Sequence, residues 1–208
     1  MSVLSREVIR ERLRLDIRDN QALVITPLLR PENAIDLDAV DLRLGCHFLL
    51  PKVPPAPAIL PGASASNSSH LHAHVPYGEY LVVPAHQTVL GATLEFLKLP
   101  YDVSGQVLTK SSVARTFTLV ETAPWIHPSY RGCLTLEIAN VSNTPLLLYP
   151  GRLICQLILL NVERPCTLGK MSGTYLGPVY PEAPKFRNPE RDLFEIGITA
   201  VKRPNFEK

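Results

Sequence analysis

The hydrophobic pattern at the start of the chain is that of a helix. Apolar side chains recur about once per helical turn among arginines and glutamates, at Leu4, Val8, Ile9 and Leu13. Ser2 and Ser5 precede or enter this run, and serine is a favoured helix N-cap. The pattern therefore predicts a short amphipathic helix over residues 4–14 that begins near one of these serines.

From residue 40 on, the pattern becomes that of β-strands. Val40–Leu50 predicts one strand, with Gly45 as a possible bulge. From residue 78 on, short strand-like runs alternate with turn residues: Tyr80–Val83, Thr88–Leu97, Gly105–Leu108, Phe117–Glu121, Cys133–Ala139, Pro145–Tyr149 and Leu153–Leu160. No helical pattern separates these runs, so they indicate a mainly β fold such as a sandwich, jelly roll or barrel.

Two stretches carry neither pattern. Residues 51–76 are rich in proline at first and then in Ala, Ser, Asn and His, which predicts a long loop insertion. In a strand, His70, His72 and His74 would share one face and could trap a metal, but in a loop we expect them to be solvated. The tail, residues 163–208, is polar and rich in Pro, Gly, Tyr and basic residues. We expect it to pack over the protein or a neighbour.

Composition and charge narrow the function classes. The 208 residues can fill the core of one domain because 46% of them are hydrophobic, and 20 prolines against 11 glycines favour a β protein. A net charge of +2 makes no general case for nucleic-acid or membrane-surface binding. No apolar run approaches the roughly 20 residues that span a bilayer, and residues 1–14 lack the apolar core of a signal peptide. We predict a single domain over residues 1–208 in a cytoplasmic protein.

The cysteines give no sign of a metal site or a redox motif. Cys46, Cys133, Cys155 and Cys166 form no C-x-x-C pair, and no His/Cys spacing suits zinc. In a reducing compartment we expect small core residues or free thiols.

Lys110–Arg115 (KSSVAR) is a candidate binding segment for an anionic small molecule. It brings two hydroxyls, backbone amides and two cations into one short stretch. Amides and hydroxyls donate to phosphate oxygens, while Lys and Arg neutralise their charge. Taken alone, such a segment is more often a serine N-cap that opens a solvated helical turn.

Glu137 lies in the middle of the predicted strand Cys133–Ala139. Strand alternation puts Leu134, Leu136 and Ile138 on one side of the strand, and Thr135 and Glu137 on the other. A mid-strand acid is either an exposed residue of the polar face or a functional carboxylate. Upstream, Trp125 lies in a proline-containing, rigid connection that either walls a pocket or plugs a core.

Taken in order, these pieces resemble the dCTP deaminase/dUTPase superfamily, and within it the dCTP deaminases. The matching segments cover most of the chain: Val40–Gly45 (VDLRLG), Leu99–Pro100 before Gly105 and Lys110–Arg115, Thr122–Ala123 followed by Ile126, Pro128 and Gly132–Glu137, and Pro150–Gln156 (PGRLICQ). Each is weak alone, but together, in order and at compatible spacing, they indicate the fold.

The resemblance implies a dUTPase-like distorted jelly roll or β-barrel with short helices, assembled as a homotrimer with active sites at subunit interfaces. It implies a deoxycytidine nucleotide as ligand, with the tail closing over the triphosphate. The catalytic positions it matches are Glu137, Ser111 and Arg115. The substrate-binding positions it matches are Lys110, Ser112, Val113, Ala114, Thr122, Ala123, Trp125, Ile126, His127, Thr135, Leu136, Gln156, Tyr180 and Lys185. We expect Lys110–Arg115 to form a pocket wall that faces Glu137.

The implied reaction is hydrolytic deamination of dCTP to dUTP and ammonia, with Glu137 as the proton shuttle. Water must be activated and ammonia must leave protonated, and one carboxylate can carry the proton if burial in a strand-lined pocket brings its pKa near the working pH. Zinc deaminases need H-x-E and P-C-x-x-C, and this sequence has neither. We therefore expect no zinc, and only Mg²⁺ carried by the triphosphate.

Departures from the family pattern leave alternatives open. His127 stands where dUTPases place a water-positioning Asp and where deaminases use an Asp near the sugar, Trp125 stands at a usually basic position, and Pro189 stands at a Gln position. Lys110 replaces an Arg, which keeps the charge but loses a bidentate fork. The alternatives are a dUTPase or bifunctional enzyme that yields dUMP, and a catalytically impaired nucleotide-binding regulatory trimer.

Overall fold

The computed structural model describes residues 2–52, 70–121, 124–163 and 177–185. These residues form a mainly β structure with 46% strand and three short helices, which confirms the predicted fold class. The helices are α1 (Arg6–Arg14), α2 (Pro31–Ala34) and α3 (Ser111–Ala114). The strands are β1 (Ser2–Val3), β2 (Val24–Thr26), β3 (Ala39–Arg43), β4 (His47–Pro51), β5 (His70–His74), β6 (Leu81–Val83), β7 (Thr88–Lys98), β8 (Val103–Thr109), β9 (Thr118–Glu121), β10 (Trp125–Ile126), β11 (Arg131–Asn140), β12 (Leu146–Leu148) and β13 (Leu153–Asn161).

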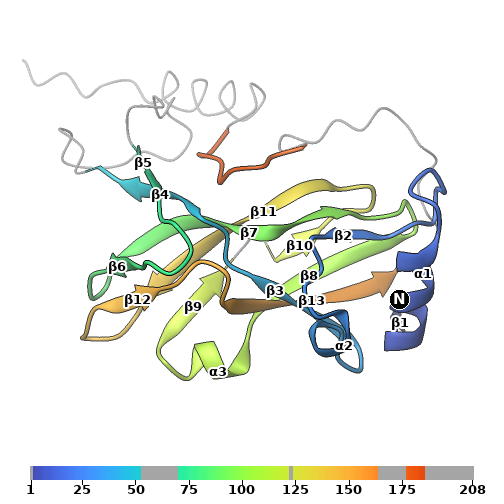
Figure 1. Ribbon diagram of the computed structural model, residues 1–208, viewed down its shortest axis with the longest axis horizontal. Coiled ribbons are helices and arrows are strands. Elements are labelled where there is room, and N and C mark those ends of the chain that lie inside the picture. Colours follow the sequence, from blue (N-terminus) through green and yellow to red (C-terminus); the bar gives the residue numbers. More distant parts are fainter. Residues whose placement is uncertain (1, 53–69, 122–123, 164–176, 186–208) are drawn as a thin grey trace, which may run out of the picture.

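Two antiparallel sheets face each other across the core (Figure 1). Sheet A has the order β1-β13-β8-β10, and β3 also pairs with β13. Sheet B has the order β5-β4-β7-β11-β9, and β2 also pairs with β7. A third, small sheet pairs β6 with β12. Among the described strands no barrel closes, so the layered, jelly-roll-like form of our prediction applies rather than the barrel.

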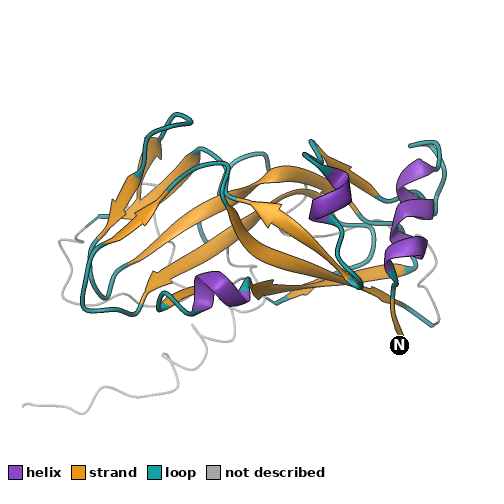
Figure 2. Ribbon diagram, turned by 60° about the horizontal axis from the view of Figure 1, so that its bottom comes forward, coloured by secondary structure: helices purple, strands orange, loops and turns teal. Residues whose placement is uncertain are grey.

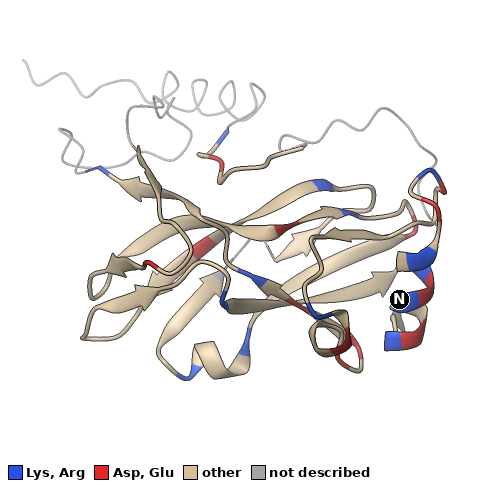
Figure 3. Cartoon of the chain, in the orientation of Figure 1, with Lys and Arg blue, Asp and Glu red and all other residues tan. Residues whose placement is uncertain are grey.

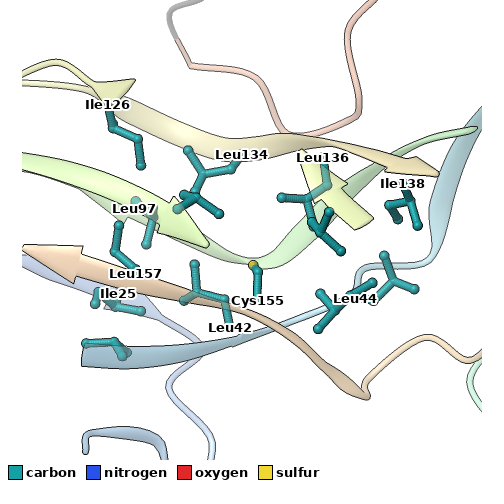
Figure 4. Packing of buried hydrophobic residues seen from close by; sticks show 14 of the residues in the cluster. Ile25, Leu42, Leu44, Leu97, Ile126, Leu134, Leu136, Ile138, Cys155 and Leu157 are labelled. Carbon is teal, nitrogen blue, oxygen red and sulfur yellow. The ribbon is translucent and has the colours of Figure 1, made fainter. Parts of the chain in front are cut away.

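The core lies between the two sheets because alternate residues of the long strands point inward. Figure 4 shows Leu42 and Leu157 of sheet A packed toward Leu97, Leu134 and Leu136 of sheet B. Two cysteines, Cys133 and Cys155, are buried free thiols, and Cys46 is a half-buried one. These cysteines are as predicted, while Cys166 lies outside the described residues.

Helix α1 begins directly after Ser5, as predicted, and covers one end of the sheets (Figure 2). Its apolar side buries Ile9 completely. Arg12 fastens the helix by donating two hydrogen bonds, of 3.1 and 2.7 Å, to the carboxylate of Asp102 just before β8. Figure 3 shows charged residues gathered on α1, whereas the sheet layers carry few. No helix that the structure describes has the length and apolar character needed to cross a membrane.

The chain passes from sheet A to sheet B at Gly45. Because β3 ends at Arg43 and β4 begins at His47, the single strand that we predicted over Val40–Leu50 is wrong. The Gly45 N–H donates to the carbonyl of Ala92 (2.8 Å), and a Cβ at this position would lie 3.0 Å from the same oxygen. The glycine therefore permits a close approach of two backbones rather than a bulge.

Residues 70–74 form β5, which pairs with β4. The predicted loop over 51–76 is therefore wrong at its C-terminal end, and residues 53–69 lie outside the described part. The three alternating histidines do share this strand, but the described residues contain no cluster of His, Cys, Asp or Glu that could hold a metal. This strand could not be predicted from its own residues, because it forms by hydrogen bonding to β4.

The strands predicted after residue 78 are all present, as β6 to β9 and β11 to β13, with ends that shift by at most two residues. The prediction missed β1, β2, α2 and β10. These elements are four residues long or shorter, so they are too short to show a period of their own.

Candidate functional site

The Lys110–Arg115 segment forms one helical turn at the end of β8. The Lys110 carbonyl accepts the N–H groups of Val113 (2.8 Å) and Ala114 (2.9 Å). Val113 packs against the core, while Ser111, Ser112 and Arg115 are exposed. The turn thus presents two hydroxyls and one guanidinium to solvent.

The charge of Lys110 is already engaged within the protomer. Its ammonium forms a hydrogen-bonded ion pair with Asp41 of β3, whose side chain is only 9% exposed. The Lys110 N–H also donates to the carbonyl of Ile154 in β13 (3.2 Å). These contacts pin the start of α3 to sheet A. The ion pair therefore holds Lys110 in place at the start of the turn that carries Ser111, and its role on the phosphate side stays a prediction.

Lys110→Met should lower the free energy of unfolding by about 3 kcal/mol, because it leaves the buried Asp41 carboxylate unpaired. Lys110→Arg keeps the charge and should cost less. The double variant Asp41→Asn/Lys110→Met should be more stable than Lys110→Met alone. Urea denaturation at a fixed protein concentration measures all of these. Wild-type stability in Lys110→Met would contradict a structural role for the pair.

Strand β11 separates core residues from site residues as the alternation predicted. Its inward residues are buried: Leu134, Leu136 and Ile138. Thr135 is half-buried and Glu137 is exposed, both on the outer face of sheet B. Leu136 is 0% exposed, so its side chain belongs to the core and only its backbone can meet a ligand. Glu137 lies opposite Leu90 of β7 and Glu121 of β9.

Residues 177–185, called the strap from here on, cross the outer face of sheet B (Figure 1). Three hydrogen bonds join the strap to β11: Gly177 N–H to the Arg131 carbonyl (2.8 Å), Cys133 N–H to the Pro178 carbonyl (2.7 Å), and Glu182 N–H to the Thr135 hydroxyl (3.1 Å). The strap therefore reaches the same strand face that carries Glu137. It is the described part of the tail that we expected to pack over the protein.

Tyr180 and Lys185, both predicted to bind substrate, belong to the strap. The Tyr180 ring meets the His47 ring edge-on, with 4.5 Å between the ring centroids. The Lys185 ammonium pairs with the Glu182 carboxylate (2.7 Å). Both residues thus lie near Thr135 through contacts within the protomer.

The predicted residues between β9 and β11 have different surroundings. Trp125 is 39% exposed on β10, whereas Ile126 is 5% exposed and packs in the core (Figure 4). His127 is exposed, and its carbonyl accepts the Tyr130 N–H (3.3 Å). Thr122 and Ala123 lie outside the described residues.

The predicted site residues occupy two different faces of the protomer. Gln156 alternates with buried Leu157 in β13 and lies opposite Asp41, so it faces outward from sheet A. Figure 1 shows α3 on the side of the molecule away from the strap, which lies over sheet B with Glu137. Within one protomer the Lys110–Arg115 segment and Glu137 do not face each other. The facing arrangement that we expected is therefore not present within one protomer.

The sequence reasoning missed three polar residues around these elements: Asp41, Glu95 and His47. Asp41 and Glu95 interrupt apolar runs (VDLRL and TLEFL), a pattern that can mark a buried carboxylate with a partner. Glu95 is 1% exposed, and its Oε2 accepts the Arg43 N–H (2.9 Å), which links sheet B to β3. Burial raises the pKa of Glu95 to about 7. The position of His47 carries no local signal, because it depends on β5 and the strap.

A separate cleft of about 470 Å³ opens at the β2 end of sheet B. Its lining consists of Ile17, Arg18, Asn20, Val24, Thr26, Phe96, Lys98, Leu99, Pro100, Tyr101, Ser129 and Arg131. None of the predicted site residues belongs to this lining. Those of them that are exposed, such as Ser111, Arg115 and Glu137, lie on open faces instead.

The family of the chain follows from comparison with known proteins. A family model described as dCTP deaminase-like matches residues 3–162. The chain belongs to the dCTP deaminase-like family. In this dCTP deaminase-like protein the match includes α3, β11 and β13, and it ends before the strap.

Relatives and a solved structure agree with this family. A protein named dCTP deaminase, dUMP-forming, from Methanobrevibacter smithii is 32% identical over 193 residues, which are 90% of this chain and 96% of the relative. One of the same name from Methanothermobacter thermautotrophicus is 31% identical over 172 residues, or 80% and 87% of the two chains. The structure of 2'-deoxycytidine 5'-triphosphate deaminase from Agrobacterium tumefaciens aligns with a TM-score of 0.56 at 22% identity, and covers 76% of this chain and 47% of that one. That alignment shows a shared fold.

Proposed function

We propose that this protein deaminates dCTP to dUTP and ammonia, as a homotrimer whose active sites lie between protomers. The observation that carries the proposal is the division of the site: α3 presents Ser111 and Arg115 beside sheet A, while Glu137 lies on the outer face of sheet B. Two protomers of a ring can place these halves against each other. The names of the relatives, dCTP deaminases, support dCTP as the substrate.

In the proposed reaction, water attacks C4 of the cytosine ring and Glu137 takes its proton. The carboxyl group then returns this proton to the departing amino group, and the second proton of the water moves to ring N3, so that ammonia leaves and a carbonyl oxygen remains at C4. Ser111 and Arg115 of the adjoining protomer hold the water and the pyrimidine. Lys110 and Ser112, with Tyr180 and Lys185 of the strap, belong to the phosphate side, where donors and cations are needed.

Metal chemistry enters this proposal only through the substrate. Mg²⁺ accompanies the triphosphate oxygens, which are the hard ligands that this ion prefers. The absence of zinc and the cytoplasmic location remain predictions.

A product assay with dCTP and Mg²⁺ is the first test. We expect dUTP and ammonia in equal amounts, because hydrolysis at C4 releases one ammonia for each uracil formed. Calorimetry on the same preparation measures binding of deoxynucleotides. Tight binding of dCTP without any uracil product would contradict the deaminase proposal and support a nucleotide-binding regulatory trimer.

Formation of dUMP is a second candidate, favoured by the names of the relatives, which are dUMP-forming. It requires a second water to attack the α-phosphate and release pyrophosphate. His127 stands where the resemblance to dUTPases expects the Asp that positions this water. The same assay separates the candidates: dUMP with pyrophosphate supports the second, and dUTP alone eliminates it.

A further inference from the structure

The strap contacts one ring of a pair of neighbouring histidines. His47 of β4 and His74 of β5 lie directly opposite each other in the strand register, and their ring centroids are 4.8 Å apart. Tyr180 meets His47 edge-on at 4.5 Å. The strap thus docks on the His47 ring, which is itself packed against His74, at one side of sheet B and on β11 at the other. We call His47, His74 and Tyr180 the latch.

The backbone of β11 is shaped for the docked strap. Gly132 has a φ of 141°, and a Cβ at this position would lie 2.4 Å from Cδ of Pro178. A side chain at position 132 is therefore incompatible with the docked position of Pro178. The glycine at position 132 is therefore required for the strap to dock in this position.

The docked strap lies on the outer face of β11, which is the face that the proposed function uses. Its Glu182 N–H binds the Thr135 hydroxyl (3.1 Å), and Thr135 shares the outer face of β11 with Glu137, two residues further along. The docked strap therefore covers the Thr135 end of this face and leaves Glu137 exposed beside it.

We propose that His47 and His74 are positioning residues that hold the strap over the Thr135–Glu137 face at neutral pH and release it in acid. Neutral imidazoles can pack against each other and against Tyr180. Protonated rings 4.8 Å apart repel each other, and a charge on the half-buried His47 loses part of its solvation. The docking step is independent of the proposed function, and only its effect on turnover rests on that function.

The surroundings of the latch support this direction. The charged or titratable groups on the elements around it are His70 and His72 of β5, Glu182 and Lys185 of the strap, Arg131, Cys133 and Glu137 of β11, and Glu95 and Lys98 of β7, and Cys46 directly precedes β4. Glu182 is paired with Lys185 (2.7 Å), and β7 contributes the apolar Leu90 beside β4. Burial, and then the nearby His74, lower the pKa of His47 from its ordinary 6.5. A lowered pKa means that the docked state favours the neutral ring. Docking therefore weakens as the pH falls below 6.5, the ordinary pKa that His47 has when the strap is released.

Hydrogen–deuterium exchange tests docking without any nucleotide. The amides of Gly177, Cys133 and Glu182 make the strap hydrogen bonds, so their protection reports docking. After correction for intrinsic exchange rates, we expect amide protection to fall up to about tenfold between about pH 7.5 and about pH 5.5. This is the factor expected if one histidine is protonated in the released state but not in the docked state. Unchanged protection across this range would overturn the latch.

Variants identify the rings responsible. His47→Phe keeps a ring against Tyr180 but cannot be protonated, so protection should persist at the lower pH, and adding His74→Phe should complete the effect. His86→Asn is the matched control: His86 is exposed, bonds Asn143 and has a positive φ that Asn tolerates. It should behave as wild type. Gly132→Ala should remove protection at every pH. If wild type and the double variant His47→Phe/His74→Phe lost the same amount of amide protection in acid, the histidines would not be responsible for releasing the strap.

Turnover gives a second readout. If the deaminase activity is present, KM for dCTP in wild type should rise in acid more than it does in His47→Phe, while kcat changes alike in both. If no deamination is found, the exchange experiment still decides the latch, so the two proposals fail separately.

Discussion

Glu137→Gln should lower kcat for dCTP deamination by at least about a hundredfold, because an amide cannot take and return the water proton. KM should change little, since Gln keeps the size and the hydrogen-bonding shape of the side chain. Ammonia release measured over a range of dCTP concentrations separates kcat from KM. Glu137 lies on the exposed side of β11, so the fold should be retained and circular dichroism should show the wild-type spectrum.

Glu11→Gln is a matched control, because Glu11 is an exposed residue of α1, far along the chain from the proposed site. It should keep wild-type kcat. Near-wild-type kcat in Glu137→Gln would remove Glu137 as the shuttle, even if dCTP proved to be the substrate.

The same variant tests whether the sites are shared between protomers. The variants Glu137→Gln and Ser111→Ala should each be inactive. When equal amounts of the two are refolded together, the mixture should regain about a quarter of wild-type activity. In a randomly mixed ring, one in four adjacent pairs of protomers combines an intact Glu137 with an intact Ser111. No recovery in mixtures shown to contain hybrid trimers would place both halves in one protomer.

Wild-type protein should lose stability between about pH 4.5 and about pH 7, and Glu95→Gln should abolish this loss. Glu95 of β7 is 1% exposed, and burial raises its pKa from 4.5 to about 7, against the opposing effect of the Arg43 N–H and charge. Its neighbours Cys133 and Cys155 are thiols whose pKa values burial also raises, so they remain neutral. The carboxyl group is therefore more easily protonated in the folded chain than in the unfolded one.

The direction follows from proton counts. Between the two pKa values the folded chain binds more protons at Glu95 than the unfolded chain, so the stabilisation is complete below pH 4.5 and is lost as the pH reaches about 7. The full difference is at most about 3.5 kcal/mol, at roughly 1.4 kcal/mol for each pKa unit. Urea melts across the range, at one protein concentration because oligomers gain stability with concentration, measure the slope.

Gln at position 95 still accepts the Arg43 N–H but does not ionise, so Glu95→Gln should give the flatter profile. The exposed residue Glu32 of α2 is the control, and Glu32→Gln should keep the wild-type slope. Parallel profiles for wild type and Glu95→Gln would mean that Glu95 is ionised in the folded chain at neutral pH.

The fold could be predicted where the signal is local. The long strands β7, β11 and β13 are runs rich in apolar residues and bounded by turn residues, and they were predicted with ends close to those observed. The turn at Gly45 and the strand β5 could not be found in this way. Gly45 is needed because Ala92, far along the chain, approaches its backbone, and β5 exists because β4 offers it hydrogen-bonding partners.

The site divides in the same manner. The family and the candidate residues of both halves, Ser111 and Arg115 on one side and Glu137 on the other, are predicted from the sequence by itself, because residue types, their order and their spacing lie along the chain. Only the tertiary structure decided that these halves lie on separate faces, that Lys110 is held by Asp41, and that the strap rests on His47. Each of these depends on strands and side chains that are distant in sequence and that meet only when the two sheets pack.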